Sequence, residues 1–303
     1  MNLKPELPNL ENVDLPQEEK PSNVVKHKND FDYTSMSTFL TCRRKYEYRI
    51  NRGLVGMAPP TAANFGKCIH SALDVWYVNH DLEATLAKFS EEFKADPDDD
   101  KRTPVMGFWI LKNYHEKYQD QPFKVLATEQ EFTIDLPWGK KLIGRIDKII
   151  EWDGVVWVMD HKTTSQLGDG YMKMHTPNMQ FTGYVYAANK LGFKCQGALV
   201  DAILVAKGLL ETSSRSKLTP LRRDFAYRSE GDIEEYLRTI YDIQQDIELC
   251  ENSQWWNQNQ DSCTDYGECP YRKVCKESVE YRERIITNDF RVEHWDPRAK
   301  EKK

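Results

Sequence analysis

Alternating and β-branched residues dominate the middle of the chain, where they predict a run of strands. Residues 123–136, 141–151 and 155–164 are rich in Ile, Val and Trp, and Asp153-Gly154 separates the last two segments. An Asp-Gly pair between such segments is a strong signal for a two-residue hairpin turn. Two more strands are expected, in the segments CQGALVDAILVAK and LRRDFAYR. The pattern therefore predicts a sheet that contains a tight hairpin.

Apolar residues at helical spacing predict helices before and after these strands. Phe39, Cys42 and Tyr46 recur at this spacing behind a Ser/Thr-rich cap, and a second helix is expected over residues 66–80. Further helices are expected at about 81–95, 103–119, 177–191 and 229–250. Helices packed around one sheet define the predicted fold class, which is α/β with a central mixed β-sheet flanked by helices.

The order of these elements predicts a single domain over residues 31–285. Residues 1–30 carry four prolines, many charges and no periodic apolar pattern, which is typical of a disordered leader. The predicted domain has an N-terminal helical part (31–120), a core (121–210), and a C-terminal helix with a cysteine cluster (211–285); residues 286–303 are expected to be a tail.

The composition narrows the classes of protein that this chain can belong to. With 40% hydrophobic residues the 303-residue chain can fill a core, and its net charge of −6 argues against a protein that coats nucleic acid through charge alone. No apolar run approaches the length of a membrane span, and the first residues lack the layout of a signal peptide. We therefore expect a cytoplasmic protein without a membrane partner. Its seven cysteines are then expected to be metal ligands or buried thiols rather than disulfides.

The predicted hairpin places charged residues inside two apolar strands. If Asp153-Gly154 forms the turn, Asp147 lies directly across from Asp160, and Lys162 emerges on the same face two residues further on. Opposed Cβ atoms in an antiparallel pair are roughly 5 Å apart, so the two carboxylates repel each other. A divalent cation with oxygen ligands would stabilise them, and the lysine could stabilise charge on a phosphate. This arrangement indicates metal-assisted phosphodiester hydrolysis.

The same residues also fit a second interpretation. At a sheet edge, the two aspartates could pair with Arg145, Lys148 or Lys162 as ordinary surface ions. The hairpin alone does not separate the two interpretations.

Several segments resemble a known nuclease family, in the order in which the family has them. GRIDKI and VVWVMDHKTT resemble the core of the PD-(D/E)XK nucleases, with Asp160, His161 and Lys162 as the D-x-K element. FGKCIH and QFTGY resemble the G-x-x-x-H and Q-x-x-x-Y motifs of its RecB-like branch. YTSMSTFLTCRRKYEYR and CTDYGECPYRKVC resemble the cysteine arrangement of the iron–sulfur exonucleases in this branch, which include CRISPR-associated adaptation exonucleases and the AddB nuclease domain. The resemblance covers about residues 33–276 and implies a restriction-endonuclease-like core.

The resemblance implies a set of active-site residues. Asp147, Asp160, His70 and the backbone carbonyl of His161 would ligate Mg²⁺ or Mn²⁺. Lys162 would be the catalytic lysine, acting together with the two aspartates.

Two further positions follow from the same resemblance. Gln180 and Tyr184 lie one helical turn apart on a shared face, and they would position the DNA strand or the catalytic lysine. The family's glutamate before the first aspartate strand corresponds to Glu129 or Glu131, and the sequence leaves both open.

Four cysteines match the implied iron–sulfur site. Cys42 stands early in the chain, whereas Cys263, Cys269 and Cys275 form a compact late group. Four thiolates are the usual ligand number of a 4Fe–4S cluster, which would clamp a helical and irregular cap onto the core. The late spacing departs from the family's commoner close pair, so zinc on the same thiolates stays open as an alternative.

The resemblance also implies a substrate and a setting. We expect a divalent-metal-dependent DNA exonuclease that acts on single strands or frayed ends in phage or bacterial recombination, repair or DNA processing, with a helicase or recombination protein as a partner. CRRKYEYR and SSRSKLTPLRRDF are candidate DNA contacts, because basic groups bind phosphates and aromatic rings stack on bases. The alternative is a non-catalytic iron–sulfur or zinc subunit that binds DNA and retains the fold.

Overall fold

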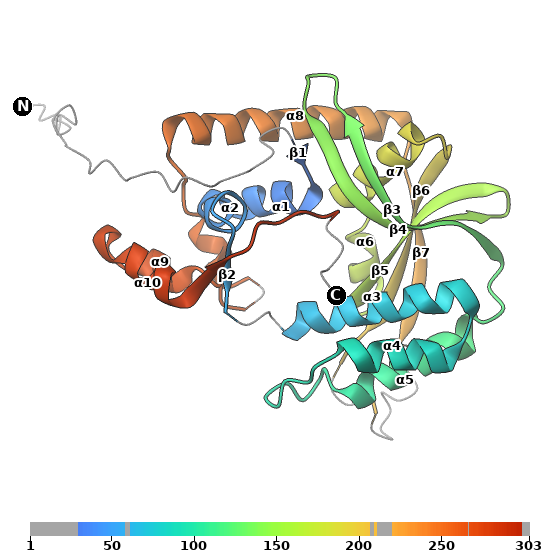
Figure 1. Cartoon of the computed structure of the whole chain (residues 1–303). Helices are drawn as coiled ribbons and strands as arrows, with labels where there is room; N and C mark the ends of the chain where they lie inside the picture. The colour runs from blue at the N-terminus through green and yellow to red at the C-terminus, as the bar shows by residue number, and fades with distance from the viewer. Residues whose placement is uncertain (1–29, 58–60, 207–208, 211–219, 266, 299–303) are drawn as a thin grey trace, which may run out of the picture.

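The computed structural model describes residues 30–57, 61–206, 209–210, 220–265 and 267–298 (Figure 1). The predicted leader lies outside the described residues except for Asp30.

A six-stranded mixed sheet forms the centre of the fold, as the strand pattern predicts. Strand β4 pairs with β1, β3 and β5; β5 continues in parallel to β6, and β7 closes the sheet antiparallel to β6. A separate two-stranded sheet joins β2 to β8. The strands are β1 (Asp30–Phe31), β2 (Leu54–Gly56), β3 (Phe123–Asp135), β4 (Lys141–Trp152), β5 (Val155–Thr164), β6 (Cys195–Leu204), β7 (Leu221–Tyr227) and β8 (Phe290–Val292).

The predicted hairpin between β4 and β5 is confirmed. Asp153 and Gly154 both have positive φ, 51° and 76°, which is the backbone of the tight turns that suit a twisted hairpin. Trp152 pairs with Val155, and the register continues to Lys148 opposite Met159. The ladder therefore ends one position before the two aspartates that the sequence places across from each other.

Helices cover both faces of the sheet (Figure 1). They are α1 (Tyr33–Thr41), α2 (Arg43–Tyr46), the π-helical turn η2 (Glu47–Asn51), α3 (Thr61–Asn79), α4 (Leu82–Glu92), α5 (Pro104–Tyr118), α6 (Asp169–Lys173), α7 (Met179–Lys190), α8 (Glu230–Ser253), η4 (Gln260–Cys263), α9 (Arg272–Lys276), η5 (Val279–Tyr281) and α10 (Arg282–Asp289). None of the helices in the described part of the chain is long and apolar enough to cross a bilayer.

The first predicted helix is divided at Cys42. The backbone of Cys42 is extended, with φ −165° and ψ 119°, and its N–H bonds the Thr38 carbonyl to end α1. The N–H of Arg44 then donates to the Asn257 carbonyl at 3.0 Å, a contact with a distant part of the chain. Apolar periodicity continues across the break, which is why the sequence predicts one helix.

Two apolar cores lie on opposite faces of the sheet. On one face, α1, α7 and α8 contribute buried residues such as Met36, Phe181 and Ile240. On the other face, α3, α4 and α5 contribute residues such as Trp76 and Phe89. Successive residues of β5 therefore point into different cores, because side chains alternate along a strand.

A third, smaller cluster joins the N-terminal and C-terminal parts of the domain. It contains Tyr48, Leu54, Tyr271 and Phe290 among its buried residues. The Tyr271 hydroxyl donates to the Leu54 carbonyl at 2.5 Å, and β2 pairs with β8. Residues 286–298, which the sequence pattern assigns to a tail, thus include a strand that packs on the domain.

Candidate active site

The candidate site lies where β4 changes partners along one edge. β3 pairs with β4 from Lys141 to Trp152, so β5 and β1 must share the opposite edge. On that edge β5 reaches only Lys148, and β1 pairs only with Lys141 and Leu142. Residues 143–145 and 147, which lie between the two, line a pocket of about 560 Å³.

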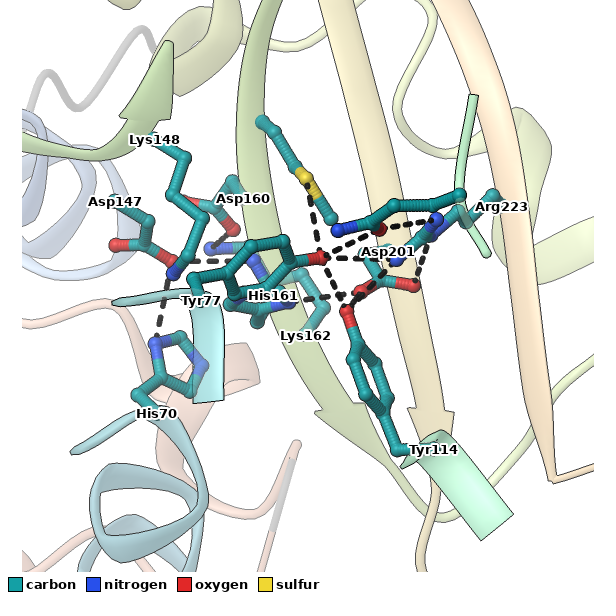
Figure 2. A network of polar contacts seen from close by, with 12 residues as sticks. His70, Tyr77, Tyr114, Asp147, Lys148, Asp160, His161, Lys162, Asp201 and Arg223 are labelled. Carbon is teal, nitrogen blue, oxygen red and sulfur yellow. Dashed lines mark hydrogen bonds and ion pairs between the residues drawn. The ribbon is translucent and has the colours of Figure 1, made fainter. Parts of the chain in front are cut away.

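Asp147 and Asp160 meet at this gap, and each carboxylate lies beside a nitrogen group of another side chain (Figure 2). Oδ2 of Asp147 lies 3.2 Å from Nδ1 of His70, and Oδ2 of Asp160 lies 2.5 Å from Nζ of Lys162. Asp160 is only 2% exposed. The interpretation as ordinary surface ions therefore fails for Asp160.

The two carboxylates have opposite pKa shifts. Burial, opposed by Lys162 and reinforced by Asp147, raises the pKa of Asp160. Burial acts on Asp147 too, but His70 outweighs it and holds the pKa of Asp147 well below its usual range. In return, the carboxylates raise the pKa of His70 against the effect of burial. Each of two adjacent carboxylates makes ionisation of the other less favourable, and a nearby cation offsets this repulsion.

Helix α3 brings His70 to the strands through a close approach at Gly66. A Cβ at Gly66 would lie 2.8 Å from Oγ1 of Thr163 on β5, so a larger residue would push the helix away. One helical turn later, His70 reaches Asp147. The glycine of the G-x-x-x-H segment therefore has a packing role that helps to place the histidine.

Helix α7 supplies Gln180 and Tyr184 to the wall of the pocket. Nε2 of Gln180 donates to the Tyr184 hydroxyl at 3.0 Å, and burial raises the pKa of Tyr184 well above its ordinary value. The neutral hydroxyl can therefore donate its own proton to an acceptor in the pocket. Lys162 is not part of the lining, but 28% of its side chain is exposed and its Nζ lies 5.8 Å from the ring centroid of Phe181.

The structure distinguishes the two candidate glutamates. Glu129 lines the pocket, and burial together with Asp74 and Asp147 raises its pKa. Glu131 is exposed and does not line the pocket, although Arg145 pairs with both glutamates, with Glu129 at 3.1 Å and with Glu131 at 3.4 Å. Glu129 has a φ of 47° within β3. Alternation alone could not indicate which glutamate faces the site, because residues two apart in a strand point to the same face.

His161 contributes to both faces of β5. Its backbone N–H donates to Oδ2 of Asp147 at 3.1 Å. Because the N–H and C=O of one strand residue point to the same edge, the expected ligand, the His161 carbonyl, is also directed toward the site. The imidazole lies on the opposite face, where Nδ1 is 2.9 Å from Oδ2 of Asp201 (Figure 2). Burial and Lys148 lower the pKa of His161 to about 4, so the neutral ring donates its Nδ1 proton to Asp201.

Asp201 is the centre of a buried network that the motifs did not indicate (Figure 2). It accepts hydrogen bonds from Tyr114 at 2.5 Å and from Nε of Arg223 at 3.1 Å. Arg223 also donates to the Tyr77 hydroxyl at 2.9 Å. Despite burial, Arg223 and His161 hold the pKa of Asp201 well below its usual range. In the sequence, the signal for this network is the single acidic residue of the apolar segment ALVDAIL.

A second ion pair, buried on the lysine side, links α3 to β4. Nζ of the fully buried Lys148 lies 2.8 Å from Oδ1 of Asp74 and 4.6 Å from the ring centroid of Tyr77. Asp74 follows His70 by one helical turn. The pair therefore fixes the helix that carries the histidine beside the strand that carries Asp147.

The donor set at the gap suits a hard divalent cation. Oxygen donors are available from Asp147, Asp160, Glu129 and the His161 carbonyl, and Mg²⁺ and Mn²⁺ prefer oxygen. Apart from its ion pair with Lys162, Oδ2 of Asp160 has no hydrogen-bond partner among the described residues. Across the described ranges, no three His, Cys, Asp or Glu side chains are already grouped as a metal site. The carboxylates instead pair with nitrogen groups of the chain.

The four expected cysteine ligands lie in one region but are not grouped closely. The N–H of Asn259 donates to Sγ of Cys42 at 3.4 Å, and Sγ of Cys263 lies 3.8 Å from the Asn259 carbonyl. The N–H of Cys269 donates to the Cys263 carbonyl at 2.9 Å. Burial raises the pKa of Cys275, and Cys269 and Cys42 are close enough to add to the shift. These contacts place the four cysteines in one region and do not show an iron–sulfur cap.

The first basic segment is used largely within the protein. Arg43 pairs with Asp246 at 2.5 Å, and Nε of Arg44 donates to the Trp256 carbonyl at 2.9 Å. These contacts join the N-terminal helices to the C-terminal half. Arg44 is mostly covered by these contacts, whereas 34% of the Arg43 side chain is exposed, so the DNA contact expected for Arg43 stays a prediction.

The second basic segment is divided between surface and interior. Arg222 pairs with Asp169 at the surface, whereas Arg223 is buried against Asp201. Arg215 and Lys217 lie outside the described residues. The expected DNA contact through Arg223 is therefore wrong, because its side chain points into the network.

Comparisons with known proteins agree with this geometry. A family model described as the PD-(D/E)XK nuclease superfamily matches residues 31–276. A solved structure entitled "Putative exonuclease" from Eubacterium rectale is 14% identical, with a TM-score of 0.51, over 83% of this chain and 90% of that one. The solved protein SSO0001 is 15% identical, with a TM-score of 0.34, over 70% of this chain and 84% of that one. No curated protein matches the sequence significantly. At these identities the first structure supports the fold alone, and the second carries no argument.

The adjacent arginines Arg222 and Arg223 allow a matched test of the network. Replacing Arg223 by Met leaves the buried Asp201 carboxylate without its cation, so we expect the free energy of unfolding to fall by about 3–5 kcal/mol. Arg222→Met removes only an exposed ion pair and should change it by about 1 kcal/mol or less. Urea unfolding followed by circular dichroism measures both. Equal losses would contradict the buried role of Arg223.

The low pKa of His161 predicts a loss of stability in acid. The folded value is about 4 and the unfolded value about 6.5. Between these pH values the unfolded chain binds a proton that the folded protein does not, so stability falls as the pH drops from about 6.5 to 4, by at most about 3 kcal/mol. Unfolding of the EDTA-treated protein across this range measures the slope. His161→Gln should flatten it, whereas the exposed control His80→Asn should not.

Proposed function

The chain belongs to the PD-(D/E)XK nuclease superfamily, and from this premise we propose that it is a divalent-metal-dependent DNA exonuclease. The observation that carries the proposal is the meeting of Asp147, Asp160 and Lys162 at the gap in the sheet, with His70 added from α3. A structural domain has no stability reason to gather these charges, because partly buried ions cost free energy unless they are compensated.

The proposed cation would be held by oxygen donors at the gap. Asp147, Asp160 and the His161 carbonyl are its proposed ligands, with His70 as a nitrogen donor and Glu129 as a further carboxylate beside the pocket. When bound, Mg²⁺ or Mn²⁺ would polarise a phosphate oxygen and offset the negative charge of the two aspartates. His70 and Lys162 would exchange their present ion pairs for contacts with the cation or the substrate.

The remaining residues would act on the substrate directly. The Lys162 ammonium would stabilise charge on the phosphate or hold the attacking water, since it lies beside Asp160 at 2.5 Å. The Tyr184 hydroxyl, which accepts a hydrogen bond from Gln180, would donate to a phosphate oxygen. On the far face, Asp201 would keep the His161 ring fixed and so hold the backbone between Asp160 and Lys162.

The size of the pocket supports a strand end as the substrate. A volume of about 560 Å³ is in the range of small-molecule pockets and can receive the terminal nucleotide of a strand. The solved neighbour entitled as an exonuclease agrees with this assignment. We place the activity in phage or bacterial recombination, repair or DNA processing, with a helicase or recombination protein as the proposed partner.

We retain the four-thiolate site as part of the proposal. We propose that Cys42 and Cys263, which both contact Asn259, hold a 4Fe–4S cluster, or zinc, together with Cys269 and Cys275. The alternative function is a non-catalytic subunit that binds DNA and would hold the metal with the same thiolates. The charge cluster at Asp160 and Lys162 favours catalysis over this alternative.

Replacing Lys162 by Met should abolish most of the nuclease activity. We expect the rate on an end-labelled single-stranded oligonucleotide with Mn²⁺ to fall by about 100-fold or more, because a charge that stabilises the transition state is removed. Lys173→Met, at an exposed lysine on α6, is the matched control and should retain full activity. If neither the wild type nor Lys173→Met degrades single-stranded or duplex DNA with Mg²⁺ or Mn²⁺, the enzyme proposal is wrong.

The thiolate site has its own test. Protein purified without oxygen should contain iron and acid-labile sulfide, or zinc, and Cys263→Ala should lose most of that metal. It should also lose stability, because metal ligation joins distant parts of the chain. The buried Cys195→Ala is the matched control and should retain the metal. A wild type without bound metal, or a Cys263→Ala protein with full metal content, would refute the assignment.

A further inference from the structure

The chain beyond the family match returns to the active-site pocket. β8 pairs with β2, and the N–H of Glu293 donates to the Gly53 carbonyl at 2.7 Å. From there the segment runs back toward the sheet (Figure 1). We name residues 293–298 the C-terminal strap. Trp295, Asp296 and Pro297 of the strap line the same pocket as His70 and Asp147, although the match ends at residue 276.

The strap is held in place by contacts on both sides of Trp295. Nη1 of Arg49 donates to the Glu293 carbonyl at 3.1 Å. Arg145 donates to the Arg298 carbonyl, and Arg298 pairs with Asp30 at 3.4 Å. The pocket wall formed by the strap is therefore tied to β1, β4 and the N-terminal helices.

Trp295 itself is oriented but not buried. Its Nε1 donates to Oδ1 of the buried Asp32 at 3.0 Å, and the guanidinium of Arg49 lies 5.7 Å from its ring centroid. Nevertheless, 39% of the residue is exposed. An indole that is fixed at its N–H while part of its ring faces a pocket can receive another flat ring at little cost in side-chain entropy.

Resting on the proposed nuclease function, we infer that Trp295 is a substrate-positioning residue that stacks on a base of the DNA strand whose phosphate lies near Asp147. The base faces are exposed in a single strand or a frayed end, whereas in a continuous duplex neighbouring bases cover them. Stacking is tolerant of sequence, because every base has a π-face. The strap would therefore favour single-stranded ends without selecting a sequence.

The charge of the pocket favours such a contact. Its lining contains six acidic side chains, against the basic groups Lys67, His70 and Arg145. The affinity gained by neutralising phosphates is therefore modest here, and it weakens further with salt. A stacked base adds affinity that does not depend on phosphate charge.

The test compares intact and abasic strands on the full-length protein. The probe is a fluorescein-labelled 12-nucleotide oligo-dT, either intact or with one abasic residue placed at each position in turn. Binding is measured by anisotropy in EDTA, and digestion of the same strands is measured with Mn²⁺. For the wild type, one abasic position should weaken binding and raise KM by about fivefold or more, which corresponds to the loss of one stacked base.

Variants at Trp295 separate stacking from anchoring of the strap. Trp295→Ala should raise KM for the intact strand by a similar factor while kcat changes less than about twofold, and it should no longer respond to the abasic position. Trp295→Phe keeps a ring but loses the hydrogen bond to Asp32, so it should restore most of the affinity and the abasic response. Trp255→Ala, at an exposed tryptophan outside this pocket, is the matched control and should behave as the wild type.

The outcomes distinguish this inference from the proposed function. If the wild type digests DNA but Trp295→Ala leaves KM and the abasic response unchanged, the stacking role is refuted and the nuclease proposal stands. If Trp295→Phe is as impaired as Trp295→Ala, the indole serves only to anchor the strap, and stacking is again refuted. If the wild type binds with the abasic signature but cleaves nothing, stacking is supported and the nuclease proposal fails.

Discussion

The early end of the β4–β5 ladder is the constraint on which the rest of the site depends. Pairing stops at Lys148 and Met159, so Asp147 and Asp160 extend beyond the last paired position without being carried out into bulk water. Two carboxylates held this closely are stable only with compensating charge. His70 from α3 and Lys162 from the strand itself are their partners, and the same arrangement leaves carboxylate oxygens near the gap in the sheet.

Because side chains alternate along β5, the two faces of this strand make different contacts. Asp160 and Lys162 belong to the side of the sheet that carries α7, whereas the intervening His161 ring is buried against Asp201 on the side of α3 and α5. The buried network on the second side fixes the histidine, and through the backbone it fixes the charged pair on the first. A catalytic group on a strand is most precisely placed when the reverse face is rigid.

The ends of the described chain complete the pocket. The strap reaches Asp32 and Arg145 only because β2 and β8 pair and the third apolar cluster holds the C-terminal helices against η2. The pocket is thus built from three sources: a gap in the sheet, the helices α1, α3, α4 and α7, and a late segment outside the family match. Relatives that share the core need not share the wall that contains Trp295.

The sequence by itself determined the elements and the local register. A turn signal at Asp153-Gly154 and alternation on either side suffice to place Asp147 near Asp160, because strand pairing beside a tight turn is a local property. It did not determine the break at Cys42, the choice of Glu129, or the burial of Arg223. Those features depend on contacts between residues far apart in the chain: a basic residue in a strand looks alike in sequence whether it meets solvent or a buried carboxylate. Only the packing of helices against the sheet decides which of the two it meets.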